Sequence, residues 1–118
     1  MELKYLIRWT TLTTLFVLVA SSNDVPKVEP FNFQRRYPVG HKAIATCTSL
    51  SPKSLSFTWL KNGKELTQSS EIRIKNDKEY SVIIIDPIEV HSQGNYTCVV
   101  SNDFGKDSFT AELLVEGK

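Results

Sequence analysis

The chain has 118 residues, 14 basic and 13 acidic, and a formal net charge of +1. A chain of this length accommodates one ordinary domain. No basic stripe runs along the sequence, so nucleic acid is not an expected partner.

The first segment, residues 1–20, has the composition of a secretory signal peptide. Lys4 and Arg8 supply its positive charge, and an apolar run of 12 residues follows. Small residues come next, so we expect cleavage after Ala20 or Ser22. The run is too short for a transmembrane anchor, which needs about 20 apolar residues. Export would place both cysteines of the chain in an oxidising compartment, where they form a disulfide.

The rest of the chain divides into a leader, a domain and a tail. Residues 21–25 form the leader, residues 26–116 the domain, and residues 117–118 a tail or the start of a linker. No second hydrophobic segment follows the signal peptide, so we expect no membrane span in this chain.

Proline shapes the first strand of the expected domain. Pro30 and Pro38 bracket residues 31–37. Because proline cannot donate a hydrogen bond to a sheet, this segment is predicted to be an edge strand that is interrupted or kinked.

The next two segments alternate between apolar and polar residues, which predicts strands. In residues 41–49, the face that carries Cys47 is the inward one. In residues 55–61, the inward face carries Trp59.

A tight turn is predicted at Asn62-Gly63, with at most a short strand just after it. Four more alternating segments follow, at residues 71–75, 80–85, 95–101 and 108–115. Short strands separated by turn signals every eight to twelve residues are typical of an all-β sandwich. No helix is predicted after the signal peptide. The expected core includes Trp59, Ile85, Tyr96 and Leu113.

The cysteines, the tryptophan and the residues before the second cysteine together resemble the immunoglobulin superfamily. Trp59 follows Cys47 by twelve residues, and the second cysteine ends the run Gly94-Asn95-Tyr96-Thr97-Cys98. The resemblance covers nearly all of residues 25–115. It implies two antiparallel sheets, ABED and A′GFC, joined by a Cys47–Cys98 disulfide against which Trp59 packs.

Smaller motifs refine the resemblance. Family domains have Asp at the position of Ser92, so the brace at that corner is expected to be weaker here, while Tyr96 should keep the tyrosine corner. The turn at residues 101–105 is similar to the Asn-x-x-Gly turn of intermediate-set (I-set) domains. Residues 26–47 and the run from Phe57 to Gly63 resemble domains of the Down syndrome cell adhesion molecule (Dscam-like) family in arthropods. That resemblance implies the N-terminal immunoglobulin domain of an adhesion receptor.

Catalytic and metal sites are not expected. His41 and His91 lie in different turns without partners at metal-ligand spacing. No Gly-x-Ser-x-Gly nucleophile motif is present. We therefore expect no enzyme activity, no cofactor and no small-molecule substrate.

Asn95-Tyr96-Thr97 is a sequon for N-glycosylation. Tyr96 is expected to face inward, so Asn95 should face outward. The alternative is that the sequon stays unmodified, because the start of a folded strand is hard for the transferase to reach.

The outward positions of the ABED sheet carry apolar residues, where polar side chains are usual. An exposed apolar patch commonly marks a contact site, although β-branched residues also favour strands for local reasons alone. The candidate partner-binding residues are Ile44, Val82 and Ile84, with Arg73, Lys75 and Glu79 as a polar rim. The second candidate surface, on A′GFC, carries Leu60, Val99 and Leu114.

The expected function is protein recognition outside the cell. The first hypothesis is an N-terminal domain of a cell-surface adhesion receptor, whose partner is a second copy of the same molecule or another surface protein. The alternative is a free-standing secreted binding protein of the immunoglobulin type, for example an immune recognition factor. Both hypotheses rely on the same domain, and they differ in whether further domains follow it.

Overall fold

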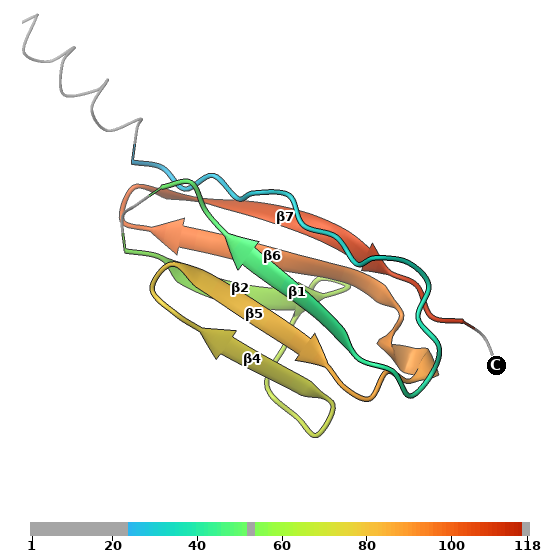
Figure 1. Ribbon diagram of the computed structural model, residues 1–118. Helices are drawn as coiled ribbons and strands as arrows, with labels where there is room; N and C mark the ends of the chain where they lie inside the picture. Colours follow the sequence, from blue (N-terminus) through green and yellow to red (C-terminus); the bar gives the residue numbers. More distant parts are fainter. Residues whose placement is uncertain (1–23, 52–53, 117–118) are drawn as a thin grey trace, which may run out of the picture.

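The alternating segments form two antiparallel sheets that pack face to face (Figure 1). This computed structural model describes residues 24–51 and 54–116. The predicted signal peptide, most of the leader and the tail at residues 117–118 lie outside the described residues.

Each sheet consists of antiparallel neighbours, in the order β1-β5-β4 for the first and β3-β2-β6-β7 for the second. The strands are β1 (Ala43–Thr48), β2 (Ser56–Lys61), β3 (Lys64–Glu65), β4 (Ile72–Asn76), β5 (Tyr80–Ile85), β6 (Gly94–Asn102) and β7 (Gly105–Leu113). Asn62 and Gly63 both have positive φ, as a two-residue hairpin turn requires. The predicted immunoglobulin-like sandwich is confirmed.

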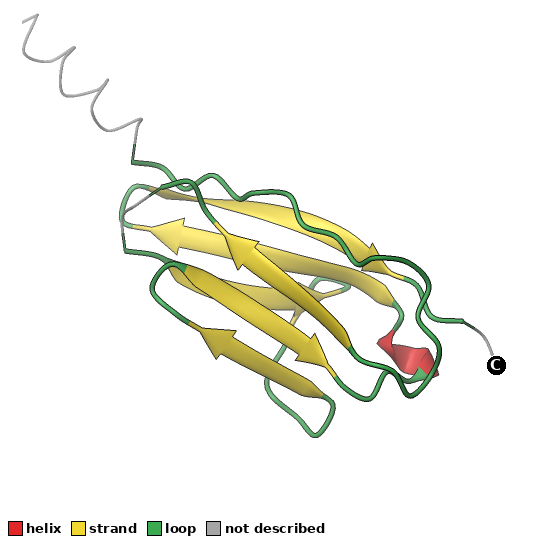
Figure 2. Cartoon of the chain, in the orientation of Figure 1, coloured by secondary structure: helices red, strands yellow, loops and turns green. Residues whose placement is uncertain are grey.

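We expected an edge strand over residues 31–37. This expectation is wrong, because the described chain forms a loop there (Figure 2). Two isolated bridges take its place. Val28 pairs antiparallel with Ser49 beside β1, and Tyr37 pairs parallel with Val115 beyond β7. Prolines at both ends of this segment lack the N–H that a continuous ladder needs. The segment therefore crosses from one sheet to the other.

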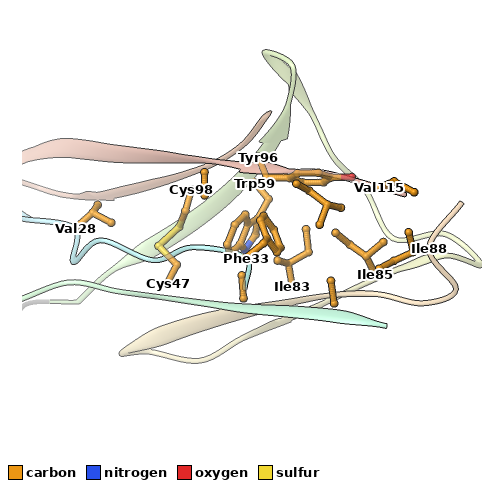
Figure 3. Close-up of a cluster of buried hydrophobic side chains, with 14 of the residues drawn as sticks. Val28, Phe33, Cys47, Trp59, Ile83, Ile85, Ile88, Tyr96, Cys98 and Val115 are labelled. Carbon is orange, nitrogen blue, oxygen red and sulfur yellow. A yellow bond between two sulfur atoms is a disulfide. The ribbon is translucent and has the colours of Figure 1, made fainter. Parts of the chain in front are cut away.

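The core lies between the sheets, around the disulfide that joins Cys47 to Cys98 (Figure 3). Trp59 is buried beside it, and its ring meets that of Phe31 edge-on, with 5.5 Å between centroids. Ile85, Tyr96 and Leu113 are also fully buried. The cysteines are 51 residues apart. A disulfide that closes a loop of that size adds about 4 kcal/mol to the free energy of unfolding in the chain-entropy model.

A short chain of hydrogen bonds crosses the core from one sheet to the other. The indole N–H of Trp59 in β2 donates to Ser81 Oγ in β5 at 2.9 Å. The Ser81 hydroxyl donates in turn to Asn76 Oδ1 at 2.5 Å. Buried polar groups are costly unless they are paired, so these contacts allow Ser81 to be fully buried between the layers.

The connection from β5 to β6 contains a one-turn 3-10 helix, Val90–Ser92, which corrects the expectation that no helix follows the signal peptide. The Ser92 N–H donates to the Glu89 carbonyl at 2.9 Å, and the Glu89 N–H donates to Ser92 Oγ at 2.9 Å. This reciprocal pair closes the turn. Local side-chain bonding of this kind leaves no periodic signal in a sequence.

The corner after this helix is held without a carboxylate at position 92. The Tyr96 hydroxyl donates to the Ser92 carbonyl at 2.5 Å, so the tyrosine corner is present. Lys61 Nζ donates to the His91 carbonyl. The His91 ring lies 2.9 Å from a carboxylate oxygen of Glu71. Three independent contacts therefore brace the corner.

Stability at high pH should depend on Tyr96. Burial, with a smaller contribution from Glu71, raises the pKa of Tyr96 to about 12. The folded protein then keeps a proton that the unfolded chain releases near pH 10. This contribution is complete below about pH 10 and is lost as the pH rises to about 12, a loss of about 2–3 kcal/mol in the free energy of unfolding.

The Tyr96→Phe variant should show a shallower fall between pH 10 and pH 12, because it lacks the titrating hydroxyl. At neutral pH it should be less stable by about 1–2 kcal/mol, since the Ser92 carbonyl loses its donor. Urea unfolding followed by tryptophan fluorescence measures both effects. Identical slopes above pH 10 for the two proteins would contradict the assignment.

Candidate recognition surface

The outward face of the β1-β5-β4 sheet brings the expected contact residues together. Ile44 of β1 pairs in register with Ile84 of β5, which pairs in turn with Arg73 of β4. Val82 is the next outward residue of β5 and pairs with Lys75. Side chains opposite each other on one face of an antiparallel pair lie about 4.5–5.5 Å apart at Cβ. The apolar residues are therefore neighbours on one surface.

Several large apolar side chains on this face reach solvent. Ile44 is 50% exposed, and Val82 and Ile84 are partly exposed. Tyr80, at the start of β5, is 42% exposed and continues the same face. The sequence pattern contains this residue, because Tyr80 lies two positions before Val82 and strand side chains alternate. We call Ile44, Tyr80, Val82 and Ile84 the apolar strip.

The charged residues expected as a rim occupy different places. Arg73 Nη2 lies 3.8 Å from Asp86 Oδ2, and both side chains are exposed, so the pair contributes little to stability. Lys75 makes no ion pair with the described residues. Glu79 lies in the turn before β5 rather than in a strand. The structure therefore places Arg73 and Lys75 along β4 beside the apolar strip, and Glu79 at one end.

The free edge of β4 is already hydrogen-bonded by the preceding loop. The Ser69 N–H donates to the Ile72 carbonyl at 3.0 Å. The Ile74 N–H donates to Gln68 Oε1 at 3.2 Å. Open strand edges are the usual sites for pairing with another chain. Here these two groups at the edge of β4 are already occupied within the chain.

The outward face of the second sheet is richer in hydroxyl groups. Val99 pairs with Thr58 and Ser108, and Thr97 pairs with Leu60 and Thr110. The hydroxyls of Thr97 and Thr110 lie 2.7 Å apart. Leu60, Val99 and Leu114 are each only partly exposed. This second candidate surface lacks an apolar residue as exposed as Ile44.

The glycosylation candidate Asn95 is exposed near the start of β6, where it pairs with Glu112. Its N–H donates to Asn62 Oδ1 at 2.9 Å. The preceding Gly94 has a φ of 155°, and a Cβ there would lie 2.9 Å from the Asn62 side chain. Glycine at this position therefore lets the Asn62 turn close against the start of the strand.

No group of three or more potential metal ligands occurs within residues 24–51 and 54–116. His41 lies before β1, and His91 lies in the 3-10 helix beside Glu71. In the same part of the chain, no helix has the length and apolar character of a membrane span.

Two antiparallel sheets, a disulfide between them and a buried tryptophan beside it define an immunoglobulin-type sandwich. The family model of the immunoglobulin I-set domain matches residues 26–115. The chain therefore belongs to the I-set family.

The chain is similar to the pro-neuregulin-1 membrane-bound isoform of Gallus gallus, with 34% identity over 101 residues, which cover 81% of this chain and 17% of that protein. It is 33% identical over 81 residues to the muscle M-line assembly protein unc-89 of Caenorhabditis elegans, and the match covers 64% of this chain and 1% of that protein. It is 29% identical over 91 residues to the cell adhesion molecule DSCAM of Gallus gallus, and the match covers 76% of this chain and 4% of that protein. The chain thus spans less than a fifth of each of these relatives.

Solved structures show the same breadth. The Dscam1 Ig7 domain, isoform 9, matches with a TM-score of 0.72 and 28% identity, covering 76% of this chain and 98% of that one. The titin M4 domain matches with a TM-score of 0.71 and 26% identity, covering 78% of this chain and 96% of that one. The comparisons support the I-set family and do not single out the Dscam-like group.

The orientation of β5 can be tested by one chemical change at adjacent positions. Ile83→Thr should lower the free energy of unfolding by roughly 2–4 kcal/mol, because Ile83 is fully buried and its replacement leaves a smaller, polar side chain in the core. Ile84→Thr should change it by less than about 1 kcal/mol, since this side chain faces outward. Chemical denaturation of both variants measures the difference. Equal losses would mean that the two faces of β5 are not distinct.

Proposed function

We propose that this domain recognises a protein outside the cell through the apolar strip on the β1-β5-β4 sheet. The carrying observation is the position of Ile44, which is half exposed and in register with Ile84. An apolar centre with charged residues at its margin is the usual composition of a protein interface. The basic side chains of Arg73 and Lys75 provide such a margin along β4.

The narrower proposal is the N-terminal immunoglobulin domain of a Dscam-like adhesion receptor, whose partner is a second copy of itself or another surface protein. The signal-peptide pattern of residues 1–20 favours export. Relatives that include a cell adhesion molecule and a membrane-bound isoform support an extracellular setting. The muscle M-line relative shows that the family alone does not fix the location.

The apolar strip can be tested with a double substitution. Val82→Lys together with Ile84→Lys should abolish binding, because two charges at the centre of the contact would have to be desolvated. Leu60→Lys together with Val99→Lys adds the same charge to the other sheet and should leave binding intact. The readouts are aggregation of beads coated with the protein and staining of cells by its tetramers.

Thermal unfolding checks that both double variants remain folded. If the Val82/Ile84 variant still binds, or if only the Leu60/Val99 variant loses binding, the proposed surface is wrong. Bead aggregation reports contact between copies, whereas cell staining without aggregation reports a different partner.

The alternative is a free-standing secreted binding protein that uses the same apolar strip. The sequence of the full transcript distinguishes the two hypotheses. Further immunoglobulin repeats and a membrane span downstream of Lys118 would favour the receptor. A stop codon there, confirmed by the mass of the secreted protein, would favour the secreted binder.

We expect Asn95 to carry an N-linked glycan, since it is exposed in a sequon on the outward face of β6. A glycan here would cover the hydroxyl-rich face and leave the apolar strip free. In protein secreted from a glycosylating host, enzymatic removal of N-glycans should increase the electrophoretic mobility. Asn95→Gln should remove this shift, and Asn32→Gln, outside any sequon, should retain it. A wild-type protein without the shift would contradict the expectation.

A further inference from the structure

A concave surface with positive charge lies where the crossing segment meets the end of the second sheet, and it shares no residue with the apolar strip. This hollow has a volume of about 500 Å³. Its lining includes Arg35, Arg36 and His41 as cationic or donor side chains, and Glu116 as the one acid. We call it the basic hollow.

The cationic groups of the basic hollow are not engaged within the protein. Neither guanidinium has a hydrogen bond or an ion pair with the described residues. Both arginines are exposed. The ring of His41 also has no partner in the described part of the chain. Unpaired arginines beside a concavity are available for an external anion.

The backbone under the hollow is fixed at two places. The Tyr37 N–H donates to the Leu114 carbonyl at 2.9 Å, and the Glu116 N–H donates to the Tyr37 carbonyl at 2.8 Å. The His41 N–H donates to the Pro38 carbonyl at 3.2 Å. Tyr37, which follows the two arginines, is therefore held to the chain just after β7.

The chemistry of the lining favours charge recognition. The anchors of protein interfaces, arginine among them, lie in well-packed and desolvated pockets, whereas Arg35 and Arg36 are exposed. The aromatic residue of the lining, Tyr37, is partly buried, and its hydroxyl already accepts the Gln34 N–H at 3.2 Å. Guanidinium groups instead pair in a planar, two-pronged manner with oxyanions. The two adjacent guanidinium groups therefore suit a ligand that carries sulfate or carboxylate oxygens.

We propose that the basic hollow binds an anionic polysaccharide through its sulfate or carboxylate groups, with Arg35 and Arg36 as the principal contacts. Glu116 opposes the ligand and limits its affinity. The site is separate from the apolar strip, so the Val82/Ile84 double variant should bind the polysaccharide as the wild type does.

Heparin is the probe, measured by the salt concentration needed for elution from a heparin column and by the Kd of the disulfide-bonded protein. Arg35→Ala together with Arg36→Ala should weaken binding about tenfold or more. Lys64→Ala together with Lys78→Ala removes the same charge at exposed positions outside the hollow and should stay within about twofold of wild type. Glu116→Gln should bind more tightly than wild type.

Three results would overturn the proposal. The first is an equal loss in the arginine and lysine double variants, because net charge alone would then explain binding. The second is an unchanged affinity in Glu116→Gln, which would place the anion away from the hollow. The third is equally tight binding of single-stranded DNA of matched charge, which would remove the preference for a polysaccharide. Thermal unfolding of each variant confirms that the comparisons concern folded protein.

Discussion

The disulfide between Cys47 and Cys98 is the constraint that decides which residues of this domain face inward and which face outward. It joins β1 of one sheet to β6 of the other, and Trp59 lies opposite Cys98 in the neighbouring strand. Because side chains alternate along a strand, fixing these residues as inward also fixes their neighbours as outward. Ile44 and Ile84 reach solvent for that reason. The same link that stabilises the core therefore determines which residues can meet a partner.

The sequence predicted the structure well in the strands, where inward and outward side chains alternate with a period of two residues. The faces of β1, β2, β6 and β7 follow from Cys47, Trp59 and Cys98, and the short β3 follows from the Asn-Gly turn. The pattern failed where other forces decide. Missing proline N–H groups reduce the first strand to two bridges. A serine side chain closes the 3-10 helix at Ser92.

The candidate sites were predicted to different degrees. Outward positions on β5 could be read directly, and Tyr80 was missed although it obeys the same alternation. The basic hollow could not be read from the pattern. Its arginines and His41 lie in the same stretch before β1, and Glu116, from the far end of the domain, reaches them only because Tyr37 pairs with Val115. In a chain of net charge +1, such a local concentration of charge is invisible to composition.

Membership of the I-set family describes the scaffold more than the activity, since one fold hosts many functions. The relatives of this chain range from a cell adhesion molecule to a muscle assembly protein. The surfaces of this domain differ in chemistry: an apolar strip on one sheet, hydroxyl groups on the other, and, at the end of the second sheet, arginines without a partner among the described residues.

The hydrogen bonds that Gln68 and Ser69 make at the edge of β4 occupy two backbone groups that an added strand would need. An open edge accepts a new strand and then presents another open edge, so growth can continue without limit. A face-to-face contact between two copies leaves no free patch once it forms, because the same patch on each copy meets the other across a two-fold axis. If copies of this domain meet through the apolar strip, that contact therefore forms closed pairs.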